Sequence, residues 1–256
     1  MAKIYMQAQR VISWLGREDE HSGPAMRLIA NSRIVEQTTQ ETLRDYLWTE
    51  VWLGINPVLH KYYERLCDER DLIVEFLSRP YWSRLWIVQE FVLARDLLLV
   101  CGPIAINISA LWRLLHICDK LIVNDENLKT MIPEAVQNLL YTRDDREQGI
   151  TFEPDLQIRA VLRDFSMRGC AEPRDRVYGL LALCYGKVQI DVDYSKPARG
   201  IFFELLEIGN LDLWYWEEWC QQLAENMGVR WEEEVLRRFV ADEEYHDDRI
   251  ESDEND

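Results

Sequence analysis

The segment from Arg79 to Glu90 constrains the fold more than any other, because it reads Arg-Pro-Tyr-Trp-Ser-Arg-Leu-Trp-Ile-Val-Gln-Glu and holds two indoles and a carboxylate in one amphipathic stretch. Trp82, Trp86 and Glu90 stand four residues apart, and on an α-helix this spacing places side chains on one slowly drifting stripe. The spacing therefore predicts a helix that follows the proline, ends near Arg95, buries both tryptophans and carries a carboxylate one turn beyond the second.

The rest of the chain also favours helices. Only 11 glycines and 8 prolines occur in 256 residues, which argues against a turn-rich β architecture. Apolar periodicity predicts further helices at 22–36, 41–54, 57–77 with a break near residue 68, 109–122, 133–141, 156–167, 173–183, 197–208, 213–227 and 231–245. Short apolar or alternating runs predict strands at 11–16, 97–102, 104–108 and 190–195. The expected fold class is α/β and predominantly helical.

Charge and cysteine usage exclude several classes of protein. The net charge of −17 argues against nucleic-acid binding. Most of it lies in residues 211–256, which carry 16 acidic and 4 basic side chains.

Six widely spaced cysteines without a Cys-x-x-Cys pair suggest reduced thiols in a cytoplasmic protein. We expect no metal site, because the one close His/Cys pair, His116 and Cys118, lies on an apolar helical stretch. The longest uncharged run, 97–112, is too short to span a membrane.

Three segments resemble the heterokaryon-incompatibility (HET) domain of filamentous fungi. That family's closing motif typically runs Arg-Pro-Trp-Phe-Ser-Arg-x-Trp-x-x-Gln-Glu, and Tyr81 and Trp82 replace its Trp-Phe pair. Residues 1–16 resemble the family pattern Met-x-x-Ile-Tyr-x-x-Ala-x-x-Val-x-x-Trp-Leu-Gly. Residues 173–181 resemble a Pro-Arg-Asp-Arg-x-Tyr-Gly-Leu-Leu segment that follows the domain.

The resemblance implies both an organisation and a role. Family members carry an Asp-Ala-x-Cys-Ile-Asn-Gln motif upstream, so the expectation is a chain that begins within the domain. It would comprise the second half of a TIR-like HET domain (1–95), a helical HET-associated region (96–210), acidic Trp-rich helices (211–246) and a disordered acidic tail (247–256). The implied role is allorecognition with programmed cell death and protein partners, without a cofactor and without enzymatic activity in this form. The oligomeric state is left open.

The same resemblance suggests an alternative function. Enzymatic TIR domains use a Ser-x-Trp-x-x-x-Glu helix against a nicotinamide dinucleotide, and Ser83, Trp86 and Glu90 fall in a comparable arrangement. Nicotinamide leaves NAD without a general acid, so one carboxylate that stabilises an oxocarbenium-like transition state can suffice. This reading makes NAD a substrate, Glu90 the catalytic residue, and Trp86 and Arg84 the substrate-binding residues.

Structural explanations compete with each of these assignments. In the structural explanation, Arg84 and Glu90 form ion pairs and have no catalytic role. Trp82 and Trp86 are then core side chains and do not contact a substrate. Arg174 and Arg176, at the start of a predicted helix, can bind a phosphate or a partner's carboxylates, or can form internal ion pairs.

Overall fold

The computed structural model describes residues 1–33, 57–121, 128, 130–150, 153–184, 188, 190–209 and 213–231. Two compact units make up the chain, Met1–Thr151 (unit 1) and Phe152–Asp256 (unit 2). The predicted helices at 41–54 and 231–245 and the acidic tail 247–256 lie outside the described residues, apart from Trp231. The domain boundaries proposed from the sequence stay predictions.

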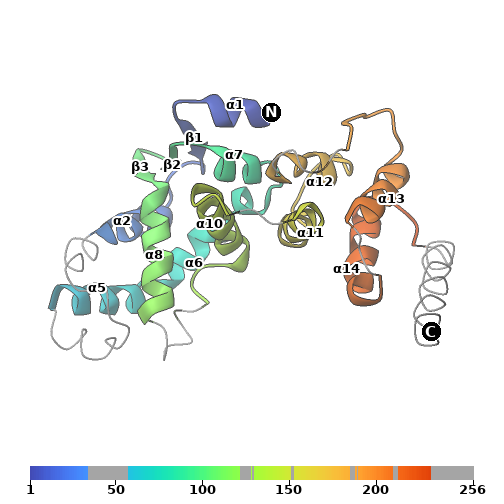
Figure 1. The fold of residues 1–256 in the computed structure, drawn as a ribbon. Coiled ribbons are helices and arrows are strands. Elements are labelled where there is room, and N and C mark those ends of the chain that lie inside the picture. The colour runs from blue at the N-terminus through green and yellow to red at the C-terminus, as the bar shows by residue number, and fades with distance from the viewer. Residues whose placement is uncertain are drawn as a thin grey trace, which may run out of the picture. The chain divides into compact units, whose positions relative to one another are not determined.

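A three-stranded sheet forms one side of unit 1 (Figure 1). Its strands are β1 (Val11–Trp14), β2 (Leu97–Cys101) and β3 (Ile104–Asn107). β1 pairs parallel with β2, so the chain between them crosses over through helices, and β2 pairs antiparallel with β3 across a tight turn. Gly102 occupies that turn at φ +54°, a backbone conformation that side chains disfavour. The three predicted strands are thus confirmed, with β2 and β3 as partners.

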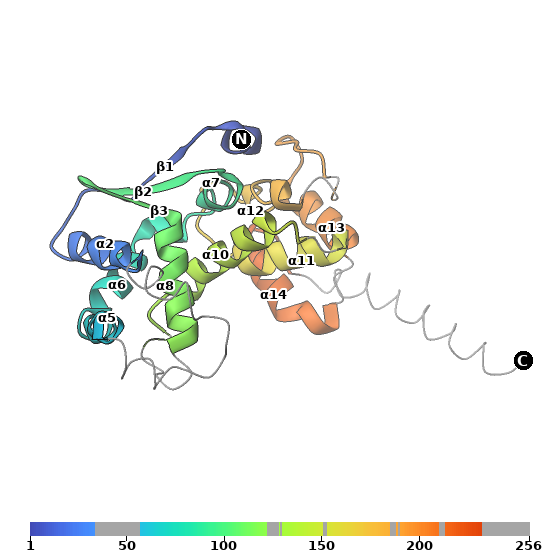
Figure 2. The ribbon, with the colours of Figure 1, turned by 60° about the vertical axis from the view of Figure 1, so that its left-hand side comes forward.

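Helices of unit 1 cover one face of this sheet. The helices of this unit are α1 (Ala2–Gln7), α2 (Ser22–Asn31), α5 (Pro57–Asp68), α6 (Arg70–Leu77), the 3₁₀ helix η1 (Pro80–Ser83), α7 (Ile87–Leu93), α8 (Ile108–Leu121) and α10 (Glu134–Glu147). In Figure 2, α2, α5, α6, α8 and α10 lie beneath the strands, whereas α1 lies above them. α2 and α8 pack against β2 and β3, and α1 packs against α7. The break predicted near Asp68 is confirmed as the junction of α5 and α6.

The core of unit 1 fills the space between sheet and helices. Fully buried side chains include Met26, Leu28, Ile73, Phe76 and Phe91. Hydroxyl groups join the layers: Ser32 Oγ donates to the Ala110 carbonyl at 3.0 Å, and Tyr62 Oη donates to the Leu28 carbonyl at 3.2 Å. Each bond satisfies a polar group that burial would otherwise leave costly.

Asx side chains upstream satisfy backbone N–H groups at the starts of two helices. α2 begins at Ser22, as predicted, and Asp19 Oδ1 accepts the Ser22 backbone N–H at 2.8 Å. α8 begins at Ile108, one residue before the predicted start, and Asn107 Oδ1 accepts the Ser109 backbone N–H at 2.9 Å. In both cases an Asx side chain upstream satisfies the free N–H, as such residues commonly do.

Unit 2 is helical in the part that the structure describes. It contains α11 (Pro154–Phe165), α12 (Asp175–Tyr178), the 3₁₀ helix η3 (Leu181–Cys184), α13 (Ala198–Gly209) and α14 (Leu213–Asn226). α11 packs against α13, and the Trp231 ring meets the Phe202 ring edge-on at 6.4 Å between centroids. The predicted helix at 173–183 is wrong as a continuous element, because it divides into α12 and η3 around Gly179.

The strand predicted at 190–195 is also wrong, because these residues form an irregular loop and a turn. Side chains take the hydrogen bonds that a strand would need. Asp193 Oδ1 accepts the Ser195 N–H at 2.8 Å, and Arg174 donates to the Tyr194 carbonyl. The fold class is nonetheless confirmed as predominantly helical α/β. The six cysteines are free thiols, as expected.

Candidate functional site

The motif segment is not the single helix that its spacing predicts. Pro80–Ser83 form the 3₁₀ helix η1, Arg84 is extended at φ −77° and ψ 138°, and α7 begins only at Ile87 with Trp86 as its N-cap. Trp82, Trp86 and Glu90 therefore do not share one helical stripe. The segment breaks because Ser83 Oγ donates to the Pro80 carbonyl at 2.9 Å, and because Trp82 turns into the core.

Trp82 is the buried anchor of the motif. Its side chain is 2% exposed, and its Nε1 donates to the Phe76 carbonyl at 3.1 Å. The indole meets the rings of Phe76, Tyr81 and Phe91 edge-on, with centroids 6.4, 5.3 and 5.8 Å away. Such edge-on contacts add to the stabilisation from burial. The expectation that Trp82 is core is confirmed.

Glu90 lies between three elements of unit 1. Its Oε1 accepts a hydrogen bond from Ser13 Oγ on β1 and another from Tyr81 Oη on η1, the latter at 2.8 Å. We call these three residues the Glu90 cluster. Ser13 is fully buried, Tyr81 and Glu90 are half-buried. Both described bonds fall on one carboxylate oxygen. Through them Glu90 connects α7 to β1 and to η1.

The pKa values of two tyrosines near Glu90 indicate that this cluster is partly shielded from solvent. Burial raises the pKa of Tyr81, and the negative charge of Glu90 raises it further. Burial also raises the pKa of Tyr5 on α1, where Glu90 acts in the same direction and Arg84 acts against it. The two tyrosines therefore stay protonated, and the Tyr81 hydroxyl remains a donor to Glu90.

The other two residues of the predicted site lie near the surface. Arg84 is exposed, and Trp86 is half-buried at the start of α7. Ser13 and Tyr81, by contrast, were not assigned to the site from the sequence. The available signal was a polar residue at an inward position of the strand Val11–Trp14, where burial demands a partner.

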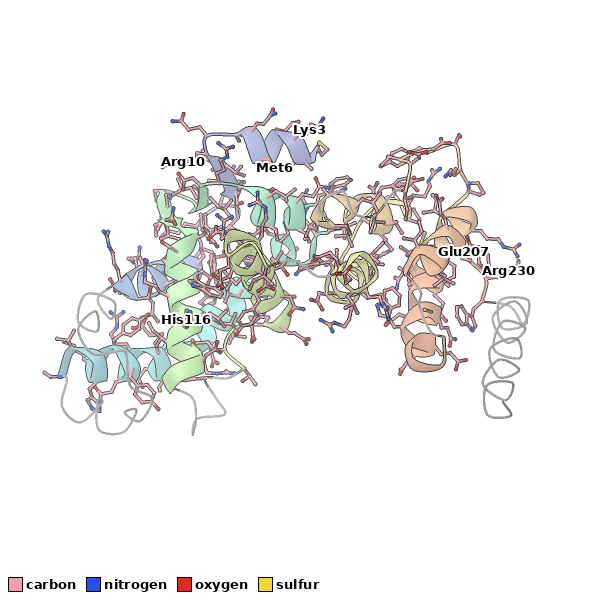
Figure 3. The ribbon with its side chains drawn as sticks, in the orientation of Figure 1. Lys3, Met6, Arg10, His116, Glu207 and Arg230 are labelled. Atoms are coloured by element: carbon pink, nitrogen blue, oxygen red, sulfur yellow. The ribbon has the colours of Figure 1, made fainter. Side chains whose placement is uncertain are left out.

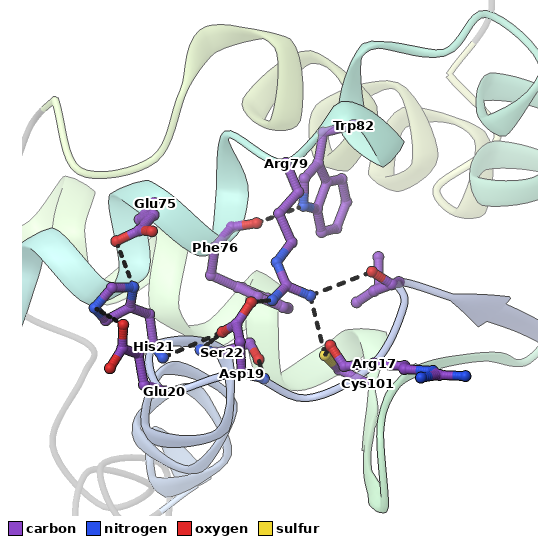
Figure 4. Close-up of polar contacts among 11 residues, drawn as sticks. Arg17, Asp19, Glu20, His21, Ser22, Glu75, Phe76, Arg79, Trp82 and Cys101 are labelled. Atoms are coloured by element: carbon purple, nitrogen blue, oxygen red, sulfur yellow. Dashed lines mark hydrogen bonds and ion pairs between the residues drawn. The ribbon is translucent and has the colours of Figure 1, made fainter.

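A second polar group, the Arg79 cluster, joins the loops that follow β1 and β2 (Figure 4). The Arg79 guanidinium donates to the Leu15 carbonyl at 3.3 Å, to Cys101 Sγ at 3.2 Å and to Asp19 Oδ2. It also lies 5.5 Å from the centre of the Phe76 ring. The first residue of the motif thus holds together the carboxyl ends of the two parallel strands.

Asp19 completes the Arg79 cluster from the start of α2. Its Oδ1 accepts the backbone N–H groups of His21 at 3.1 Å and Ser22 at 2.8 Å. The pKa of Asp19 is lowered to about 2, chiefly by the Ser22 N–H and also by the positive charge of Arg79. The carboxylate is half-exposed, so solvent weakens its attraction to Arg79.

This lowered pKa predicts a loss of stability in acid. A carboxyl with a folded pKa below its unfolded value, which is about 3.9, stabilises the fold above that value and loses the contribution as the pH falls towards 2. We expect the unfolding midpoint of the wild type to fall more between pH 5 and pH 2.5 than that of Asp19→Asn. Asp71→Asn, which removes an exposed carboxylate on α6, is the control and should match the wild type. Equal pH slopes for wild type and Asp19→Asn would contradict the assignment.

The arginines of unit 2 act within the fold. Arg174 Nε and Nη2 donate to the Glu172 carboxylate at 2.7 and 3.1 Å, and Nη1 donates to the Lys196 carbonyl at 3.2 Å. Arg176 Nη1 donates to the Ser166 carbonyl at 2.6 Å, just beyond the end of α11. Of the alternatives for these arginines, the structure supports internal pairing.

Unit 1 contains a cavity of about 240 Å³ at the other end of the sheet. Its lining includes Arg95, Asn107, Trp112, Arg143 and Glu147. None of Glu90, Trp86 and Arg84 lines it. Among the residues that the structure describes, no group of three or more His, Cys, Asp or Glu side chains could hold a metal ion. No helix in the described parts is long and apolar enough to cross a membrane.

Comparisons with known proteins agree with the motifs. Residues 1–90 match the family model described as Heterokaryon incompatibility protein (HET). Over 117 residues the chain is 25% identical to Heterokaryon incompatibility protein 6, OR allele, of Neurospora crassa. This match covers 40% of the chain and 17% of the Neurospora protein. No solved structure matches the chain significantly.

Proposed function

We propose that this chain acts in heterokaryon incompatibility as a binding component that does not hydrolyse NAD. The observation that carries the proposal is the Glu90 cluster, in which hydroxyls of Ser13 and Tyr81 bind the candidate catalytic carboxylate. A carboxylate with this arrangement has a structural role that explains its presence in the motif. The motif's other prominent residues, Arg79 and Trp82, also hold unit 1 together.

The setting of this function follows from the same proposal. The chain acts in the cytoplasm on a protein partner, in the pathway that ends in programmed cell death after fusion of incompatible cells. The match to an incompatibility protein supports the pathway. The net charge of −17 supports a protein partner over nucleic acid. No cofactor is needed for such a role.

NAD hydrolysis by a TIR-like site is the second candidate. One feature favours it: the described bonds to Glu90 fall on Oε1, and the residue is only half-buried, so the second carboxylate oxygen would be the one to accept a bond from a ligand hydroxyl. Glu90 would stabilise the oxocarbenium-like transition state, with Arg84 and Trp86 contacting the substrate. The absence of these residues from the described cavity counts against it.

Expression in a filamentous fungus tests the proposed function. We expect the chain to change the fraction of fused hyphal cells that take up a vital dye. We expect Glu90→Gln to do the same, because glutamine keeps the size and the acceptor oxygen. Immunoblots establish equal protein levels. An unchanged fraction of dying cells at confirmed wild-type expression would refute a role in incompatibility. An effect that Glu90→Gln abolishes, at equal protein level, would favour hydrolysis instead.

A further inference from the structure

The cavity of about 240 Å³ in unit 1 has no part in the proposed function. It lies at the start of α8, and Figure 3 shows that end of the helix next to the sheet, with His116 further along. The ends of β2 and β3 form the cavity together with α8 and α10. All of its lining residues lie between 95 and 147, in segments that the structure describes, and β1 supplies none of them.

Arg143 forms a fixed part of the cavity wall. Its side chain is 8% exposed, and its guanidinium donates to the carbonyls of Phe91 at 2.7 Å and Arg95 at 3.3 Å. It also pairs with Glu147 at 2.8 Å. These bonds connect α10 to the segment before β2, so the wall is held in place before a ligand binds. A site that is already ordered loses less entropy on binding.

The cavity reaches from the core of unit 1 to its surface. Leu97 and Leu140 in the lining are buried, whereas Arg95 and Ser109 are exposed. The volume is below the roughly 300–1,000 Å³ of sites for drug-sized ligands. The cavity therefore suits one small ring rather than a dinucleotide.

Several lining side chains keep unused hydrogen-bonding capacity. Among the residues that the structure describes, the Arg95 guanidinium and the Trp112 Nε1 hydrogen have no acceptor. Asp144 and Glu147 each accept a described side-chain bond on only one carboxylate oxygen. The cavity thus offers donors and acceptors together. A hydroxyl group both donates and accepts, so a ligand rich in hydroxyls can use both kinds of partner.

The charges of the lining favour a neutral ligand. Two arginines and three carboxylates line the cavity, and one of these carboxylates, Asp96, pairs with Arg10 at 2.5 Å. The charges therefore nearly cancel. A phosphate would meet the other carboxylates, and an ammonium ion would meet the arginines. Contacts between like charges are costly and discriminate against both.

Trp112 supplies a flat apolar surface in this polar lining. The indole is half-buried, and it meets the rings of His116 and Tyr141 edge-on, with centroids 4.9 and 5.8 Å away. These contacts hold the plane of the indole in place. The face of an aromatic ring is partly negative and attracts the positive hydrogens of C–H bonds. A sugar ring combines a face of C–H bonds with a rim of hydroxyls.

We infer that this cavity binds a neutral hexose unit, either as a free sugar or as the end residue of a glycan. The indole of Trp112 carries the C–H face of the sugar. Arg95 donates to its hydroxyls, and Asp144 and Glu147 accept from them. This binding site goes beyond the proposed function and does not rest on it, because Glu90 is not in the lining.

Saturation-transfer NMR on the full chain tests the inference. The probes are D-glucose, D-mannose, D-galactose and N-acetyl-D-glucosamine, each with its methyl glycoside. We expect at least one of them to bind in the millimolar range, and its 6-phosphate and 2-amino forms to bind about tenfold more weakly. Binding of the methyl glycoside assigns the site to the end of a glycan, and its failure to bind assigns the site to the free sugar. No binding of any neutral sugar at tens of millimolar, or tighter binding of a charged form or of adenosine, would overturn the inference.

Variants locate the sugar on the chain. Trp112→Leu removes the flat ring and Arg95→Gln removes the guanidinium, and each should weaken binding about tenfold. Arg17→Gln, on the loop after β1 and outside the lining, is the matched control and should bind like the wild type. Both arginine variants should keep the wild-type melting temperature, because the two side chains are exposed. Unchanged binding in Arg95→Gln and Trp112→Leu would place the sugar elsewhere and overturn the inference.

Discussion

Trp82→Ala is expected to destabilise the chain by about 3–5 kcal/mol, the usual cost of truncating a buried tryptophan. The change removes an indole that is 2% exposed, its bond to the Phe76 carbonyl and its contacts with three aromatic rings. Such a loss is a large part of the roughly 5–15 kcal/mol that stabilises a typical domain. Denaturant unfolding followed by circular dichroism measures it, and insoluble protein is the extreme form of the same result.

Trp86→Ala is the matched control within the same motif. Trp86 is half-buried at the N-cap of α7, so its truncation should cost roughly 1–2 kcal/mol and leave a soluble protein. The helical stripe expected from the sequence would make the two tryptophans equivalent. If Trp86→Ala destabilises the protein as much as Trp82→Ala does, the division of the motif into η1 and α7 is wrong.

Gly102→Ala is expected to cost about 2–4 kcal/mol, through two separate effects. At φ +54° an alanine is strained by about 1 kcal/mol. Its Cβ would also lie 2.6 Å from Glu18 Cβ and 2.9 Å from the Glu18 backbone nitrogen, so backbone must move, and overpacking of this kind costs typically 1–3 kcal/mol. The Gly102 N–H bond to the Gly16 carbonyl, at 3.0 Å, is then disturbed as well.

Gly149→Ala separates the two effects. Gly149 has φ +72°, and a Cβ added there meets nothing within 4 Å. This variant should lose only about 1 kcal/mol, and the difference between the two variants measures how tightly the loops after β1 and β2 pack. Equal losses in the two variants would show that these loops yield easily.

Much of the fold could be predicted because its signals are local. The apolar runs of β2 and β3 flank Gly102, and the period of α5 and α6 is interrupted near Asp68. Both features depend on residues close together in the sequence. Residues 1–90 match the HET family model, and the motifs at residues 1–16 and 79–90 lie within that range.

The site was harder to predict because its contacts join distant residues. Glu90 meets Ser13, 77 positions away, and neither position shows this in its local pattern. The spacing of Trp82, Trp86 and Glu90 predicts a helix, but burial of Trp82 and the bond of Ser83 to Pro80 overrode it. Tertiary contacts of this kind commonly overcome a local preference.

Release of nicotinamide from NAD tests most directly the central claim that Glu90 serves the fold and not catalysis. The purified full chain and Glu90→Gln are incubated with NAD at micromolar protein, and product is separated by chromatography. We predict that both samples release no more nicotinamide than buffer. The account is contradicted if the wild type turns over NAD and Glu90→Gln does not, while the two proteins unfold at the same denaturant concentration.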